Sequence, residues 1–72
     1  MKNIKVLAAV NLDALEDGQI EVESSFDTIA EAKKRAKYYL TTEYQNVCEA
    51  ATRLTYSQVV VNDIVMYDYV KP

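Results

Sequence analysis

Residues 59–70, VVVNDIVMYDYV, form a nearly continuous apolar run with one polar pair, Asn62-Asp63, in its middle. A type I′ turn needs positive φ at both central residues, and Asn and Asp tolerate that conformation better than most residues. The run therefore predicts a β-hairpin whose strands cover residues 56–61 and 64–70. Because the hairpin is apolar on both faces, a helix packed on one face would leave the other face uncovered.

Uninterrupted pairing across this turn would sort the hairpin into two chemically different faces. Residues that pair directly share a face, and neighbours along a strand alternate between faces. One face is then aliphatic, which suits a helix-facing core, and the other carries tyrosines, which are enriched in protein interfaces. The alternative is that the tyrosines only cover an open, solvent-facing surface of the sheet. The predicted core face holds Val59, Val61, Ile64, Met66 and Val70, and the predicted outer face holds Tyr56, Gln58, Val60, Val65, Tyr67 and Tyr69.

The N-terminal part of the chain predicts a second hairpin. Apolar residues alternate over residues 4–12, which indicates a first strand, and again over residues 19–24, which indicates a second strand. The segment between them contains Gly18, which can adopt positive φ and close a turn. The apolar residues of the second strand take the core side, so Glu21 and Glu23 are expected on the outer face.

A long amphipathic helix is predicted between the two hairpins. Thr28 followed by Glu31 has the spacing of a capping box, which marks a helix start. Apolar residues then recur every three or four positions, so one stripe runs along the whole segment. We favour one continuous helix over residues 28–53. The alternative is a break into two helices at the β-branched pair Thr41-Thr42.

These elements predict a single domain over residues 1–72, of the α+β class. The sheet would be antiparallel and four-stranded, with one long helix packed on one face, in the order ββαββ. The chain is near the lower size at which one hydrophobic core sustains folding, so burial of further area in a homodimer would add stability.

The sequence contains no constellation that indicates catalysis or metal binding. There is no His, which excludes His-based acid–base catalysis and His-containing metal sites. The single cysteine, Cys48, lacks a second Cys for a zinc or redox motif and is expected to be a small buried residue of the helix. The only glycine is Gly18, so there is no phosphate-binding Gly loop. We therefore expect a protein that is not an enzyme and that uses no cofactor and no metal.

Charge is distributed unevenly along the chain, although the formal net charge is only −3. Seven acidic residues and no basic residue lie between Asp13 and Glu31, and a short cationic cluster follows. With Tyr38-Tyr39 beside it, this cluster could contact phosphates and stack on bases. It supports two alternatives, a homodimeric binder (sponge) of a small anionic nucleotide ligand and a nucleic-acid-binding module, but a solvated helix face is favoured over both. The cluster consists of Lys33, Lys34, Arg35 and Lys37.

The predicted outer sheet face is the preferred candidate for binding. Its tyrosines have apolar bodies and polar tips, so they can anchor a protein contact while half exposed. Its carboxylates would complement a basic groove on a larger protein partner. A second copy of the chain is the alternative partner. The candidate partner-binding residues are Tyr56, Tyr67, Tyr69, Glu21 and Glu23.

In its small size, acidic charge, lack of His and tyrosine-bearing sheet, the chain resembles small inhibitors encoded by phages and mobile elements, the anti-CRISPR proteins among them. The resemblance covers the general layout of the chain and no individual residue. It implies an inhibitor that binds a CRISPR effector or a comparable host defence or nucleic-acid-processing protein and blocks its nucleic-acid or partner site.

The expected location is the cytoplasm, which would be that of the host cell if the protein is phage-encoded. Lysines followed by an apolar run also begin signal peptides, but Lys5 interrupts this run and acidic residues follow it, as in an amphipathic strand. The apolar stretches are shorter than the ~20 residues of a membrane span, so no membrane association is expected. The single Cys cannot form a disulfide within the chain, which agrees with a reducing compartment.

Overall fold

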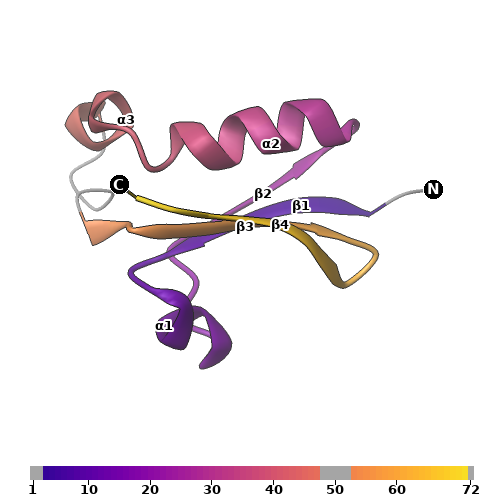
Figure 1. Cartoon of the computed structure of the whole chain (residues 1–72), viewed down its shortest axis with the longest axis horizontal. Helices are drawn as coiled ribbons and strands as arrows, with labels where there is room; N and C mark the ends of the chain where they lie inside the picture. Colours follow the sequence, from indigo (N-terminus) through magenta and orange to yellow (C-terminus); the bar gives the residue numbers. More distant parts are fainter. Residues whose placement is uncertain (1–2, 48–52, 72) are drawn as a thin grey trace.

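The structure is a computed structural model that describes residues 3–47 and 53–71. It is an α+β domain with a four-stranded antiparallel sheet of strand order β2-β1-β3-β4 (Figure 1). Helix α2 packs on one face against β1 and β3, and helix α1 lies on the opposite face. The predicted fold class is therefore confirmed. The elements are β1 (Ile4–Ala9), α1 (Leu12–Glu16), β2 (Val22–Phe26), α2 (Ile29–Tyr38), α3 (Thr42–Val47), β3 (Tyr56–Val61) and β4 (Ile64–Val70).

The core lies between α2 and the sheet face that it covers. Ala32 and Ala36 are fully buried on α2, and their small side chains let the helix lie close to β1 and β3. Val6 and Val59 pair in neighbouring strands and supply fully buried side chains on the sheet side. Ser57 is buried there too, and its Oγ donates a hydrogen bond to the Ala36 carbonyl oxygen at 2.8 Å. The close approach of helix and sheet fixes α2 over the central strands.

The predicted continuous helix is wrong, and the alternative of a break at the threonines is confirmed. α2 begins after Thr28, whose Oγ1 accepts a hydrogen bond from Glu31 N at 3.2 Å, but it ends at Tyr38. Thr41 then joins two helices, because its Oγ1 donates to Tyr38 O at 2.7 Å and accepts from Tyr44 N at 3.2 Å. A hydroxyl that bonds to the backbone on both sides competes with the helical hydrogen-bond ladder, which explains the break.

A short helix, α1, replaces most of the turn predicted between the first two strands. Asn11 has extended backbone, and its side chain accepts a hydrogen bond from Ala14 N at 2.7 Å, which makes it the N-cap. Gly18 has a φ of 85° and donates to Leu15 O at 3.0 Å, while Gln19 donates to Ala14 O at 2.8 Å. These two bonds form a Schellman motif, which uses the positive φ predicted for Gly18. The first strand is shorter than predicted as a result.

The turn of the closing hairpin is the predicted one. Asn62 and Asp63 have φ values of 51° and 68°, as a type I′ turn requires. The Asn62 side chain also accepts a hydrogen bond from Asn3 N at 3.0 Å, and Asn62 N donates to Asn3 O at 2.8 Å. The turn is thereby tied to the residue that precedes β1.

The register of this hairpin is not the predicted one. Pairing follows the prediction only for the two pairs next to the turn, and then shifts by one residue so that Val59 pairs with Tyr67. Met66 is left as the extra residue of a β-bulge. Because side chains alternate along a strand, one extra residue moves every later side chain to the opposite face. Tyr67 and Tyr69 therefore lie on the α2 face and not on the outer face.

The predicted core face of the hairpin is correct for β3 and wrong for β4. Val59 is buried and Val61 packs against the core. Ile64, Met66 and Val70 were expected in the core, but they are 63%, 49% and 71% exposed. The bulge turns Val70 away from α2, and α2 lies mainly over β1 and β3, so most of the apolar edge strand is not covered by the helix.

The remaining expectations concern the first hairpin, the cysteine and membranes. The antiparallel pairing of the first two strands is confirmed, although β2 covers Val22–Phe26 rather than residues 19–24. Cys48, and with it residues 48–52 of the predicted long helix, lie outside the described residues. In the part of the chain that the structure describes, no helix is both long enough and apolar enough to span a membrane.

Candidate functional site

The tyrosines of the predicted outer face are divided between the two faces of the sheet. Tyr56 lies on the face opposite α2, where it is buried instead of exposed. Its hydroxyl accepts a hydrogen bond from Gln58 Nε2 at 3.2 Å and donates one to Asp68 Oδ2 at 3.4 Å. Burial raises the pKa of Tyr56, and the nearby Asp68 carboxylate adds to that rise. Tyr56 therefore connects β3 to β4 and cannot serve as an exposed anchor.

Tyr67 and Tyr69 lie on the α2 face, each covered by one lysine. Lys33 Nζ is 4.3 Å from the centre of the Tyr67 ring, and Lys37 Nζ is 5.5 Å from the centre of the Tyr69 ring. Both distances fall within the ~6 Å range of a cation–π interaction. The structure thus brings together two residues of the predicted partner-binding set and two of the predicted anion-binding set.

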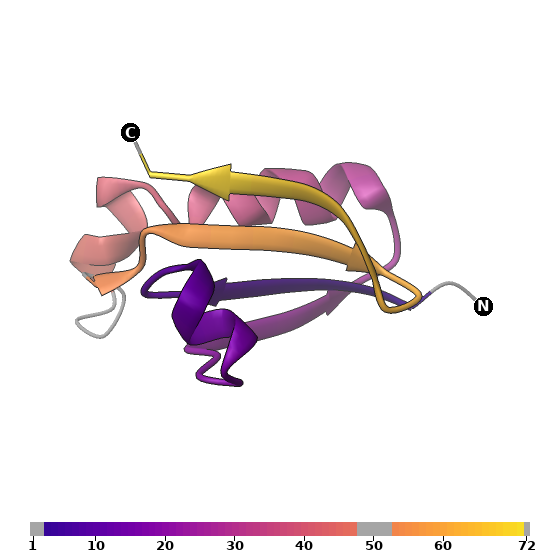
Figure 2. The same ribbon diagram turned by 60° about the horizontal axis from the view of Figure 1, so that its bottom comes forward.

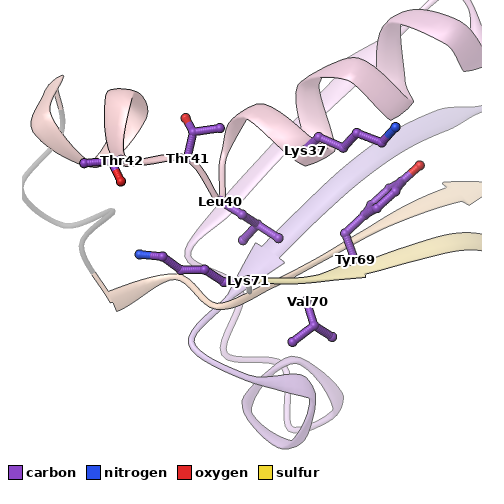
Figure 3. Close-up of a pocket in the computed structure, with 7 residues that line it drawn as sticks. All are labelled: Lys37, Leu40, Thr41, Thr42, Tyr69, Val70 and Lys71. Atoms are coloured by element: carbon purple, nitrogen blue, oxygen red, sulfur yellow. The ribbon is translucent and has the colours of Figure 1, made fainter.

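A groove beside these pairs opens between the C-terminal end of α2 and the end of β4 (Figure 3). Its volume is about 470 Å³, and the charged residues that line it, Lys37 and Lys71, are both cationic. The amino group of Lys37 is directed towards the Tyr69 ring. Lys71 Nζ donates a hydrogen bond to Gln45 Oε1 at 2.6 Å, which holds it against α3. The lining residues are Lys37, Leu40, Thr41, Thr42, Tyr69, Val70 and Lys71.

The other two cations of the predicted cluster lie on a different side of α2. Lys34 and Arg35 line a second depression, of about 490 Å³, together with Phe26, Glu31 and Tyr38. The Arg35 guanidinium carbon is 5.2 Å from the centre of the Tyr38 ring. The cationic cluster therefore does not form one continuous surface, because one half lies over β4 and the other lies towards Phe26 of β2.

Glu21 and Glu23 lie at the edge of the sheet farthest from β4. Glu23 is exposed and pairs with Leu7, which places it on the face opposite α2, as predicted. Glu21 is exposed just before β2, where its backbone N donates to Ala8 O at 3.0 Å. The five predicted partner-binding residues therefore do not form one surface.

A tyrosine cluster at the helix break was not predicted. The Tyr44 ring centre lies 4.9 Å from that of Tyr39 and 5.2 Å from that of Tyr38. Tyr39 is buried, and its hydroxyl is 2.9 Å from Ser24 Oγ of β2. The cluster packs α3 against the end of α2.

The outer edge of β4 is a surface that was not predicted from the sequence. This strand ends the sheet order, and within residues 3–47 and 53–71 no strand pairs with its outer side (Figure 2). Backbone N–H and C=O groups along such an edge can accept another strand. The side chains along the strand are largely apolar and yet exposed. They are Ile64 (63%), Val65 (53%), Met66 (49%), Tyr67 (37%) and Val70 (71%).

The groups around β4 are suited to binding. The lysines offer ammonium groups above tyrosine rings, and the Thr41 hydroxyl is occupied by two hydrogen bonds to backbone. The backbone edge offers directional hydrogen bonds, and the apolar side chains offer area that can be removed from water. In comparisons with known proteins, no family model, no curated protein and no solved structure matches this chain.

Proposed function

We propose that this protein is a small, non-enzymatic interaction protein whose β4 edge binds a larger protein. The observation that carries the proposal is the row of exposed apolar side chains on an edge strand that has no outer partner among the described residues. Edge strands are usually shielded by charges, bends or covering segments, because they template pairing with another chain. β4 also presents two lysine–tyrosine pairs, so an added strand would find side-chain partners as well as backbone partners.

Occupation of a surface is sufficient for an inhibitor. A protein of 72 residues that covers a strand or groove on a larger effector prevents that effector from binding its own partner there. This mode of action agrees with the resemblance to phage- and mobile-element-encoded inhibitors of the anti-CRISPR type. A host defence or nucleic-acid-processing protein is accordingly the proposed class of target.

The test compares two double variants that carry the same pair of changes. Ile64→Gln with Val70→Gln alters β4, whereas Ile20→Gln with Val47→Gln makes the same changes away from that strand. All four side chains are between 39% and 77% exposed, so both variants should fold and both keep the net charge.

The measurement is capture of a partner from host lysate by the tagged protein, with the partner identified by mass spectrometry. We expect the β4 variant to lose the partner that the wild-type chain captures, because its apolar contacts are removed. The control variant should retain it. Equal capture by the two variants would contradict a role for β4.

The groove in Figure 3 favours a second candidate function, the binding of a small anionic nucleotide. Its cations, Lys37 and Lys71, could hold phosphate groups, and the Tyr69 ring could stack on a base. Native mass spectrometry with ADP as the probe should then show a retained adduct, which Lys37→Gln weakens and Lys34→Gln does not. A wild-type spectrum without adduct at low salt would remove this candidate, and a dimeric adduct would indicate the homodimeric sponge.

A further inference from the structure

We infer that the segment accepted by β4 is an extended strand in which acidic and apolar side chains alternate, with the acidic side chains on the α2 face. The inference rests on the proposed function, because it names the chemistry of the partner that this edge would bind. It is carried by the spacing of the lysines above β4, by the residues on the opposite face of the strand and by the position of the bulge.

The cations above β4 repeat at the interval of a strand. Lys33 and Lys37 are one helical turn apart, which is about 6.0 Å along the helix axis at 1.5 Å per residue. Tyr67 and Tyr69 are two residues apart in a strand, which is about 6.6 Å. The similarity of the two intervals lets each ammonium group lie over one ring. An added strand would lie ~4.8 Å beyond β4 and repeat its side chains at the same ~6.6 Å, so two successive carboxylates on one face would each approach one lysine.

The opposite face of β4 favours apolar side chains on the added strand. Val65 and Val70 lie on that face and are 53% and 71% exposed. Asp68 lies between them, with its carboxylate accepting a hydrogen bond from the Tyr56 hydroxyl. A second carboxylate beside Asp68 would be repelled, whereas an aliphatic side chain would pack on the two valines. The α2 face of β4 therefore favours acidic side chains on the added strand and the opposite face favours apolar ones, so the two kinds should alternate along it.

A second copy of the chain is a poorer occupant than an acidic strand. Antiparallel pairing of β4 with itself would place Lys33 and Lys37 of both copies on the same side of the joined sheets. Their ammonium groups would repel one another across the new interface. The Met66 bulge also interrupts the regular edge and leaves residues 67–70 as the continuous segment for pairing. The carboxylates of an acidic partner strand would instead be attracted to Lys33 and Lys37 at the same edge.

The test uses a short blocked peptide in which Glu and Val alternate, and a peptide of equal length in which Lys and Val alternate. Each is titrated at low ionic strength into the full-length ¹⁵N-labelled protein while the backbone amide resonances are followed. We expect the Glu–Val peptide to shift the amides of β4 and the Lys–Val peptide to bind more weakly. Lys37→Gln should weaken Glu–Val binding about two- to fivefold, as for an exposed ion pair. Lys34→Gln is the same change on the other side of α2 and should leave the affinity unchanged.

Equal affinity for the two peptides, or amide shifts confined to other elements, would overturn the inference. A dimer of the free protein through β4, seen as concentration-dependent broadening of the same amides, would overturn it as well. The proposed function is tested separately by the capture experiment with the Ile64 and Val70 variants. A partner captured through β4 by a protein that does not bind the acidic peptide would refute this inference and leave the proposed function standing.

Discussion

The two edge strands, β2 and β4, expose their side chains in opposite ways. In β2, Val22, Ser24 and Phe26 are half-buried on the α2 side, while Glu23 and Ser25 are exposed on the other side. In β4 every residue except the half-buried Tyr69 is exposed, and most of these residues are apolar. Strand β2 therefore has the regular alternation of an edge that faces solvent, and β4 does not.

This difference separates an edge that needs no partner from an edge that gains from one. Glu21 and Glu23 place charge along the outer side of β2, which discourages the pairing of another strand. In β4 the single charged side chain, Asp68, is engaged by the Tyr56 hydroxyl. Apolar exposure on a strand whose one charged side chain is engaged thus favours β4 as the proposed binding edge, whereas the acidic residues and the tyrosines had been predicted on one surface.

Deletion of Met66 tests the bulge most directly, because it removes the extra residue of β4 and leaves every observed pair of the hairpin in place. Tyr67 would still pair with Val59 and Tyr69 with Ser57, so both side chains would stay on the α2 face of a strand that no longer has a bulge. We expect the free energy of unfolding to fall by less than about 1 kcal/mol, because the deleted side chain is 49% exposed and no other side chain changes its face. Urea denaturation measures the change.

The control for this deletion is Met66→Ala, which keeps the number of residues and so keeps the bulge. Because the Met66 side chain is 49% exposed, this variant should lose less than about 1 kcal/mol. A loss of about 3 kcal/mol for the deletion alone would contradict the bulge, because only in an uninterrupted register would the deletion move every later side chain of β4 to the opposite face.

The same substitution in each edge strand measures the contrast between the strands directly. Val22 of β2 is half-buried and packs against the core, whereas Val70 of β4 is 71% exposed. Val22→Gln should lower the free energy of unfolding by about 1.5 kcal/mol, and Val70→Gln by less than about 0.5 kcal/mol. Thermal denaturation of the two variants compares them, and similar losses in both would remove the distinction between the edges.

The elements that were predicted correctly have strong local signals. The Asn62-Asp63 turn depends on residues that tolerate positive φ, and the start of α2 depends on a Thr28 cap. Helix α1 was missed because five residues are too few to show helical periodicity. Its signals were present as a cap at each end, Asn11 before the helix and Gly18 after it, and these caps could have been read as a pair.

The bulge could not be predicted in the same way, and the arrangement of the site depends on it. No residue type marks a bulge at Met66, because the shift is favoured by contacts with α2 that form only in the folded chain. Tyr67, Tyr69, Lys33 and Lys37 were therefore predicted as candidate binding residues, but on two unrelated surfaces. Pairing rules alone gave the wrong face for every β4 residue beyond the shift.

Ionisation of Tyr56, which connects β3 to β4, should weaken the fold at alkaline pH. Burial raises its pKa above the usual 10.0, so the folded state holds the phenolic proton more tightly than the unfolded state does. The stability that results is present below the unfolded pKa and is lost as the pH rises through the folded pKa. The free energy of unfolding should therefore fall above the unfolded value of 10.0.

Tyr56→Phe tests this dependence. The variant should lose about 1 kcal/mol at neutral pH, because Gln58 and Asp68 each lose a hydrogen-bond partner. Its free energy of unfolding should also decline less steeply above the normal tyrosine pKa of about 10. Urea denaturation of both proteins over a series of pH values measures the two slopes, and parallel slopes would contradict the raised pKa.

The smallest expected effect concerns the contact between Lys33 and the Tyr67 ring. Its coupling energy shows whether the cation on the β4 side of α2 is held in place. A double-mutant cycle of Lys33→Gln and Tyr67→Leu, measured by urea denaturation, should give a coupling energy of about 0.5 kcal/mol, as for an exposed cation–π pair. The matched cycle, Arg35→Gln with Tyr38→Leu, reports the same kind of contact on the side towards β2, where the separation is 5.2 Å instead of 4.3 Å. A coupling confined to Arg35 and Tyr38 would mean that Lys33 is not held over the ring. The ordered cation–π contact would then lie on the β2 side of α2, and the spacing of the lysines would no longer favour β4 as the edge that accepts an acidic strand.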